Sequence, residues 1–184
     1  MRLRFVSAIF LALLFVHTGW TAISWADDVV PPCLSYGRDL PINNQQVLHW
    51  KRTTPNQFRE RAHVSGTIVQ VFPDRNGHEH FVINIGKHGE DTIEIIYNQD
   101  FGPIPDPRIG MTVEACGDYI TSTARSGPYP ASPVGAIIHW VHANPSGRGH
   151  DPGFVVIDGK LCGQDAEGAG PRPRPRPRPP RRHR

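Results

Sequence analysis

The chain has 184 residues, of which 38% are hydrophobic, and a formal net charge of +3. This length fits one modest domain. Residues 27–170 carry 11 Lys and Arg against 17 Asp and Glu, a net charge of −6, whereas the last 14 residues carry seven Arg. The predicted domain is therefore acidic, and a basic face that would dock a nucleic-acid backbone is not evident in it.

The first 26 residues have the pattern of a secretory signal peptide. Arg2 and Arg4 precede an almost unbroken apolar run at 5–16, and Ser24-Trp25-Ala26 offers small residues at a cleavage site. The run is shorter than the about 20 residues that span a bilayer. An uncleaved anchor is the alternative. We expect a mature chain from Asp27, a periplasmic or secreted location, and no membrane span after cleavage.

Residues 27–62 are predicted to form an N-terminal arm before the barrel domain. A short helix is expected within residues 43–61, with Asn43 or Asn44 as its cap. Pro55 would break this helix because proline lacks the amide hydrogen that a helix interior needs.

Residues 63–163 are predicted to form the β-domain. Asn76-Gly77 favours a type I′ hairpin turn, and Asp158-Gly159 favours a turn inside the last element. The expected strand elements are 64–73, 80–85, 92–97, 111–120, 135–142 and 153–161.

This pattern predicts an all-β fold, a small closed barrel of five to six strands (OB-like) with a short N-terminal helix or arm. Gly66 would let the long first strand bend around a barrel corner. A β-sandwich is the alternative. The residues expected in the core are Ile68, Phe81, Ile83, Ile95, Val113 and Ile138.

Three cysteines, Cys33, Cys116 and Cys162, lie in the predicted mature chain. In an oxidising compartment two of them should pair, and the third stays free, buried or intermolecular. We favour Cys33–Cys116, which would tie the arm to the barrel. Cys116 falls on the strand face of Thr112 and Asp118, away from the core.

The segment 135–154 is the candidate ligand-binding site because polar and aromatic side chains gather there. Asn144-Pro145-Ser146-Gly147 predicts a tight turn that folds the following residues back on the preceding strand. His139 is expected to be the most buried of the group, Arg148 to pair with Asp151, and Trp140 to line the core or a groove. The candidates are His139, Trp140, His142, Arg148, His150 and Asp151.

No catalytic residue or cofactor is predicted, because the chain contains no reaction-defining motif. An alternative is a Zn²⁺ or Cu²⁺ site, since imidazole suits both ions. Hydrogen-bonded structural histidines are the competing interpretation. The candidate metal ligands are His80, His139, His142 and His150.

The string from Gly135 to Phe154 also resembles the signature of an uncharacterised family of small secreted bacterial proteins. Members share a "V-I-H-W-T-H-x-D-P-x-G-R-H-x-x-G-W" type run, and the resemblance covers roughly residues 64–161. This chain departs from it at Val141, Asn144 and Phe154, and by the insertion of Gly149. The resemblance implies an exported β-barrel and leaves the function open.

Residues 164–184 are predicted to be a glycine hinge and a disordered Pro-Arg tail, because alternating Pro and Arg form neither helix nor ladder. The tail would bind an anionic envelope polymer or nucleic acid with strong salt dependence. A proline-recognising groove, the acidic domain itself, or no role are the alternatives.

The sequence thus predicts an exported β-barrel binding or interaction module, for a polar or anionic envelope component. The alternative is a metal-dependent, nuclease-like hydrolase that uses the cluster from His139 to Asp151. It requires at least three of the site's His and Asp side chains to converge in a concave site.

Overall fold

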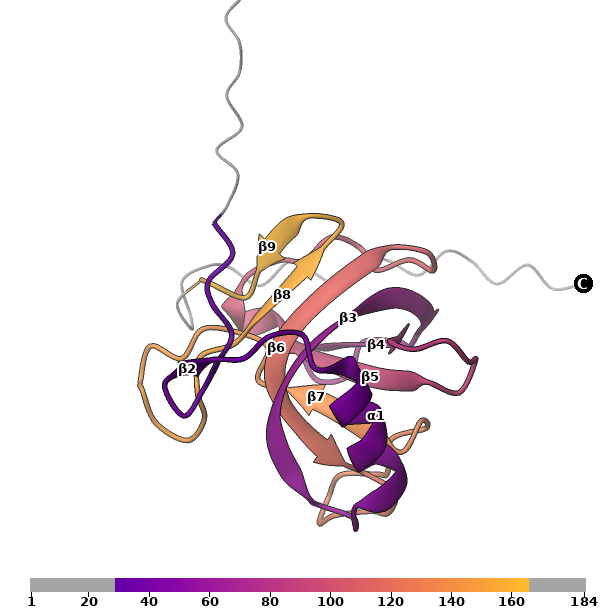
Figure 1. Ribbon diagram of the computed structural model, residues 1–184. Helices are drawn as coiled ribbons and strands as arrows, with labels where there is room; N and C mark the ends of the chain where they lie inside the picture. The colour runs from indigo at the N-terminus through magenta and orange to yellow at the C-terminus, as the bar shows by residue number, and fades with distance from the viewer. Residues whose placement is uncertain (1–28, 166–184) are drawn as a thin grey trace, which may run out of the picture.

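The computed structural model describes residues 29–165, so the signal-peptide and Pro-Arg tail predictions lie outside the described residues. Five strands close into a barrel in the order β3-β4-β5-β7-β6, and β6 pairs back with β3 (Figure 1). Only β5 and β7 run parallel among these pairs. The predicted small closed β-barrel is confirmed. The strands are β3 (Arg59–Val71), β4 (His78–Asn84), β5 (Thr92–Asn98), β6 (Thr112–Thr121) and β7 (Ala136–His139).

The described residues also form two further hairpins and a short 3₁₀-helix. The strands β8 (Phe154–Ile157) and β9 (Lys160–Cys162) form a hairpin that extends the sheet from β6. The strands β1 (Leu34–Ser35) and β2 (Arg38–Asp39) form a separate hairpin, and η1 (Gln99–Phe101) follows β5. Within residues 29–165, no helix is long and apolar enough to cross a membrane.

The predicted turns form as expected. Asn76 and Gly77 both have positive φ values, 55° and 76°, in the tight turn before β4. Asp158 and Gly159, in the turn between β8 and β9, also have positive φ values, 46° and 80°. Positive φ at both central positions is the geometry of a type I′ turn, which matches the twist of the paired strands.

The long strand β3 begins at Arg59, earlier than the predicted start at Val64. It pairs with β6 over its first part and with β4 over its last part. A register shift between Ile68 and Gln70 bends the strand from one partner to the other. Gly66 lies just before this bend, where an added Cβ atom would collide with the carbonyl of Asn84. The predicted role of Gly66 at a barrel corner thus has a steric basis.

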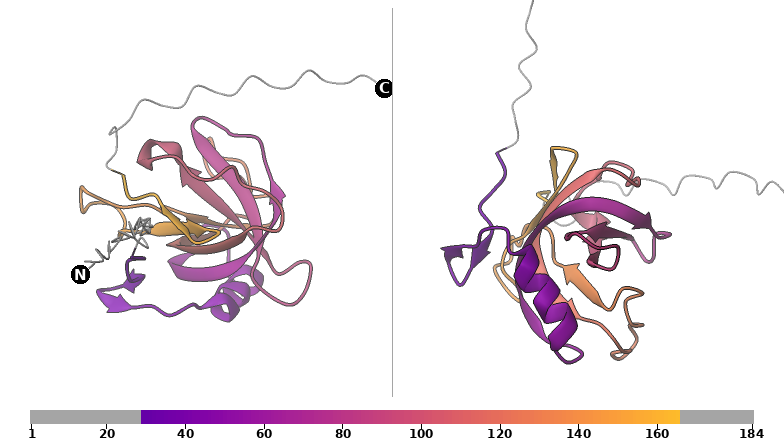
Figure 2. Two further views of the ribbon diagram at one scale, coloured as in Figure 1. Left: turned by 90° about the horizontal axis from the view of Figure 1, so that it is seen from above. Right: turned by 45° about the vertical axis from the view of Figure 1, so that its right-hand side comes forward.

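The helix α1 (Asn44–Thr53) lies against β3 (Figure 2). Asn43 is the N-cap residue, as predicted, but its side chain makes no cap hydrogen bond. Its Oδ1 instead accepts the His63 amide hydrogen at 2.9 Å, so the side chain fastens the helix start to β3. The helix ends at Thr53 because the residue before Pro55 is extended.

The barrel interior holds the predicted core. Val47 and Leu48 of α1 are also buried in this core. All six predicted core residues are at most 2% exposed: Ile68, Phe81, Ile83, Ile95, Val113 and Ile138.

The predicted disulfide Cys33–Cys116 is confirmed. Both cysteines pack with Phe154 in a second apolar cluster outside the barrel, on the predicted outer face of β6. The bond thereby ties the arm to the barrel. Cys162 is buried and packs with the barrel core.

Candidate functional site

The strand β7 ends at His139, whereas the sequence predicted that it would continue to His142. The chain leaves β7 at Trp140, which has a positive φ of 54°, a conformation that costs a bulky L-residue roughly 1–2 kcal/mol. The side chain of the next residue, Val141, is buried in the core. Tight packing of the surrounding backbone therefore has to offset the strain at Trp140.

Three glycines supply this packing. A Cβ atom on Gly117 would lie 2.5 Å from the His139 carbonyl oxygen, and one on Gly163 would lie 2.8 Å from the Val141 carbonyl oxygen. On Gly153 it would collide with the Trp140 carbonyl oxygen. The backbone of residues 139–142 is thus held between β6 and the chain on both sides of the β8–β9 hairpin.

The predicted turn at Asn144–Gly147 is present. The Gly147 amide donates to the Asn144 carbonyl at 3.1 Å, and the Asn144 side-chain amide donates to the carbonyls of Arg148 and His150. These bonds fold His150 back until its ring centroid lies 5.1 Å from that of His142. The predicted approach of His150 to His142 is therefore confirmed.

Aromatic and imidazole rings form a continuous band on this side of the barrel. Trp140 stacks on His150, with centroids 5.5 Å apart, and the Arg59 guanidinium carbon lies 5.3 Å from the Trp140 ring. Phe101 stacks on His142 at 3.6 Å. Trp140 is partly buried among these neighbours and contacts both Arg59 and His150.

The prediction that His139 is the most buried residue of the segment is wrong. His142 is 4% exposed, because its ring stacks on Phe101, whereas His139 stays half-buried on the outer face of β7. His142, rather than His139, contacts the turn backbone: its Nδ1 lies 2.7 Å from the Ala143 carbonyl oxygen.

His139 and His142 both have a pKa well below the ordinary value of an imidazole. Burial, together with repulsion from His78 and other neighbouring imidazoles, lowers the pKa of His139 to about 3. Burial also lowers the pKa of His142 to about 4, and repulsion from His150 adds to the effect. Both rings are therefore neutral at pH 7.

The predicted metal ligands do not form a shared site. His80 lies on β4, and its Nδ1 is 2.8 Å from Glu94 Oε1, while Ser132 donates to the other oxygen of Glu94. Among the residues that the structure describes, no group of three or more His, Cys, Asp or Glu side chains is arranged to hold a metal ion. The geometry gives the hydrolase alternative no support.

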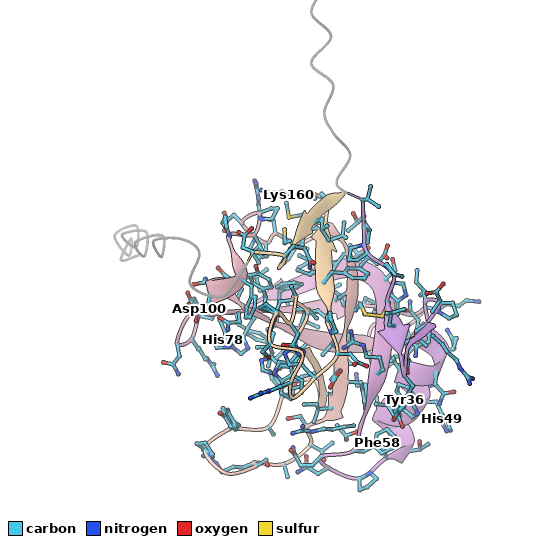
Figure 3. All side chains as sticks on the ribbon, turned by 90° about the vertical axis from the view of Figure 1, so that its left-hand side faces the viewer. Tyr36, His49, Phe58, His78, Asp100 and Lys160 are labelled. Carbon is cyan, nitrogen blue, oxygen red and sulfur yellow. A yellow bond between two sulfur atoms is a disulfide. The ribbon has the colours of Figure 1, made fainter. Side chains whose placement is uncertain are left out.

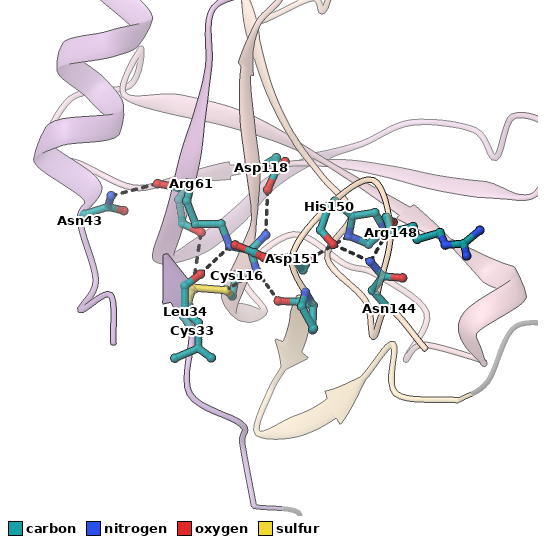
Figure 4. A network of polar contacts seen from close by, with 12 residues as sticks. Cys33, Leu34, Asn43, Arg61, Cys116, Asp118, Asn144, Arg148, His150 and Asp151 are labelled. Atoms are coloured by element: carbon teal, nitrogen blue, oxygen red, sulfur yellow. Dashed lines mark hydrogen bonds and ion pairs between the residues drawn. A yellow bond between two sulfur atoms is a disulfide. The ribbon is translucent and has the colours of Figure 1, made fainter. Parts of the chain in front are cut away.

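Arg148 does not pair with Asp151, contrary to the prediction. Its side chain is exposed, points away from the network of Figure 4, and forms no ion pair with any carboxylate within residues 29–165. The reason is the turn at Asn144, which fixes the Arg148 backbone through its amide and carbonyl and leaves the side chain in solvent.

Arg61 is the arginine that organises this region (Figure 4). Its Nη1 donates to Asp118 Oδ1 at 2.8 Å, and its Nε donates to the Leu34 carbonyl at 3.0 Å. Its Nη2 donates to the Pro152 carbonyl and lies 3.1 Å from Cys116 Sγ. One buried guanidinium thus joins the β1–β2 hairpin, β6 and the loop before β8.

These three segments and β3 line an open polar pocket of about 410 Å³. Arg59 and the pair of Arg61 and Asp118 lie on its β3–β6 side, and Ser35 and Tyr36 come from the hairpin. Gly147, His150 and Asp151 come from the opposite loop. The volume lies within the range of about 300–1,000 Å³ that is typical of small-molecule sites.

Tyr36 is the most exposed aromatic residue of the pocket. It sits with Gly37 in a tight turn, with φ values of 51° and 73°, and its side chain is 87% exposed at the surface of the molecule (Figure 3). Tyr36 was not predicted from the sequence, although Gly37 beside it is a turn signal.

The predicted site and the pocket overlap in part. His150 and Asp151 line the pocket. Trp140 does not line it but contacts two residues that do, Arg59 and His150. His139 and His142 belong to the adjoining ring band. The pocket residues that the sequence analysis missed are Ser35, Tyr36, Arg59, Glu60, Arg61 and Asp118.

Comparison with known proteins returned no matching family model, no matching curated protein and no matching solved structure. The resemblance to a family of small secreted bacterial proteins therefore stays a prediction, and the geometry of the pocket is the basis for a functional assignment.

Proposed function

We propose that the protein is an exported binding module whose pocket holds a polar saccharide of the cell envelope. The observation that carries the proposal is the composition of the pocket between the β1–β2 hairpin and the 147–151 loop. It combines an exposed aromatic ring, Tyr36, with the charged hydrogen-bonding groups Arg59, Asp118 and Asp151.

This combination suits the two faces of a sugar. Sugar hydroxyls both donate and accept hydrogen bonds, so a carboxylate such as Asp151 and a guanidinium such as Arg59 are complementary partners. The C–H face of the ring is apolar and packs on an aromatic side chain. Tyr36 offers such a surface at the edge of the pocket, with a hydroxyl that can stay in water.

The fold and the disulfide support the same assignment. Small barrels of the OB type bind oligosaccharides and oligonucleotides, and the acidic charge of residues 27–170 disfavours the second class. A buried disulfide is typical of proteins that fold in an oxidising compartment outside the cytoplasm. Binding is favoured over catalysis because the Asp118 carboxylate is held by Arg61 and the described histidines form no metal site.

Calorimetric titration of the chain from Asp27 to Arg184 with envelope monosaccharides and disaccharides tests this function. Tyr36→Ala should weaken binding about two- to tenfold, the effect of losing about 0.5–1.5 kcal/mol of aromatic contact. Tyr129→Ala is the matched control, because Tyr129 is 73% exposed but lies outside the pocket. Equal behaviour of the two variants, or no binding of any sugar, would contradict the proposal.

A further inference from the structure

We infer that the pocket selects sugars that carry a carboxylate group, and that Arg59 is the residue that selects them. This inference rests on the proposed function and specifies its ligand class. Three observations support it. Only Arg61 of the two pocket arginines is paired with a carboxylate, the Arg59 guanidinium contacts the Trp140 ring, and acidic side chains line the same pocket.

Arg59 and Arg61 differ in whether their charge is paired with a carboxylate of the protein. Arg61 is buried and donates to Asp118, to the Leu34 and Pro152 carbonyls, and toward the Cys116 sulfur. Its charge is thereby matched inside the protein. Arg59 is exposed and forms no ion pair with a carboxylate in the described part of the chain. The pocket therefore offers a ligand one unmatched guanidinium.

Arg59 is also held in place before any ligand arrives. Its guanidinium lies over the Trp140 ring, which itself stacks on His150 and has a backbone locked by close contacts with neighbouring glycines. A cation–π contact of this kind, with the guanidinium carbon 5.3 Å from the ring centroid, restrains the guanidinium while its N–H groups stay available to a ligand. That arrangement suits the two oxygens of a carboxylate and limits the entropy lost on binding.

The other charges of the pocket restrict the kind of anion. Glu60 and Asp151 line the same pocket, and their charges would repel a phosphate dianion or a nucleic-acid backbone. A sugar with one carboxylate fits better, because its anionic group can meet Arg59 while its hydroxyls donate to Asp151. The pocket thus favours an acidic sugar over both a neutral sugar and a polyanion.

Two pairs of probe sugars measure the effect of the carboxylate group on affinity. N-Acetylmuramic acid differs from N-acetylglucosamine by a lactyl carboxylate, and galacturonic acid differs from galactose by oxidation of one carbon. The acidic member of at least one pair should bind roughly tenfold or more tightly, as expected for a hydrogen-bonded charged group. This preference should shrink as the salt concentration rises.

Arg59→Gln is the decisive variant. It should abolish the preference for the acidic member, because the unmatched charge is removed while a side chain that can hydrogen-bond to sugar hydroxyls remains. Arg125→Gln is the matched control, since Arg125 is exposed on the loop between β6 and β7 and does not line the pocket. Thermal unfolding of each variant verifies that the fold is retained.

The outcomes separate the two proposals. If both members of each pair bind equally, and binding still depends on Tyr36, the saccharide function stands and the inference about Arg59 is wrong. The same holds if Arg59→Gln and Arg125→Gln behave alike. If no probe binds to the wild-type chain, the proposed function fails, and the inference fails with it.

Discussion

Arg61 and Asp118 face one another across β3 and β6, and their ion pair lies where the pocket walls meet. The residues are direct partners in the strand register, and the guanidinium nitrogen lies 2.8 Å from the carboxylate oxygen. Arg61 is almost fully buried, so its charge depends on the partners that this pairing positions. The pair therefore contributes to the stability of the fold and also to the shape of the pocket.

Arg61→Met should lower the free energy of unfolding by about 3 kcal/mol, because it removes one partner of a buried, hydrogen-bonded ion pair. Urea unfolding measures the change. Arg52→Met is the control: Arg52 is exposed, and its 3.5 Å pair with Asp91 should contribute less than about 1 kcal/mol. Similar losses for the two variants would show that Arg61 does not have the organising role assigned to it.

Loss of the Cys33–Cys116 disulfide should lower the free energy of unfolding by about 2–4 kcal/mol, since the bond closes a long loop between the arm and β6. Unfolding of Cys33→Ala, compared with the wild-type chain under oxidising conditions, measures this. Cys162→Ala serves as the control that leaves the bond intact. Recovery of Cys116 as a thiol from the unreduced wild-type chain would contradict the assignment.

The strands and the core were predictable because they depend on local patterns. Alternation of β-branched residues located the strands, and the Asn76-Gly77 and Asp158-Gly159 signals located two turns. The start of β3 was missed because the segment from Arg59 to Arg61 is polar. Its strand conformation is imposed by pairing with β6, a contact between residues far apart in the sequence.

The pocket could be predicted only in part, for a related reason. His150 and Asp151 were found because polar side chains concentrate near the end of the domain. Tyr36 and Arg59 reach the same pocket through the disulfide and through the pairing of β3 with β6. No local pattern predicts a tryptophan with positive φ, so the end of β7 and the inward turn of His142 could not be foreseen.

Gly153→Ala should lower the free energy of unfolding by about 1–3 kcal/mol or more, because the added methyl group would collide with the carbonyl oxygens of Trp140 and Cys116. These are backbone atoms and cannot rotate away. Gly89→Ala is the matched control, since a methyl group added at Gly89 would have no atom within 4 Å and the φ of this residue is not positive. A small effect at Gly153 would show that the backbone around Trp140 can relax.

Acidification should destabilise the protein through His139 and His142. In the unfolded chain both imidazoles take up a proton near pH 6.5, whereas in the folded protein their pKa values are about 3 and about 4. Between these limits the unfolded state binds more protons, so the free energy of unfolding falls as the pH is lowered from about 6.5 toward 3. Above about pH 7 the imidazoles of His139 and His142 are neutral in both the folded and the unfolded chain. They should then no longer make the melting temperature depend on pH.

His142→Phe isolates the contribution of His142 to this effect. Phenylalanine can keep the stack on Phe101 but cannot be protonated, so the melting temperature of the variant should fall less steeply than that of the wild type between pH 6.5 and 4. His49→Phe is the matched control for replacing a histidine by phenylalanine, because His49 is exposed on α1. Calorimetric scans at half-unit pH steps provide the comparison. Parallel pH profiles for the wild type and His142→Phe would mean that the buried imidazole of His142 is not a source of the acid sensitivity.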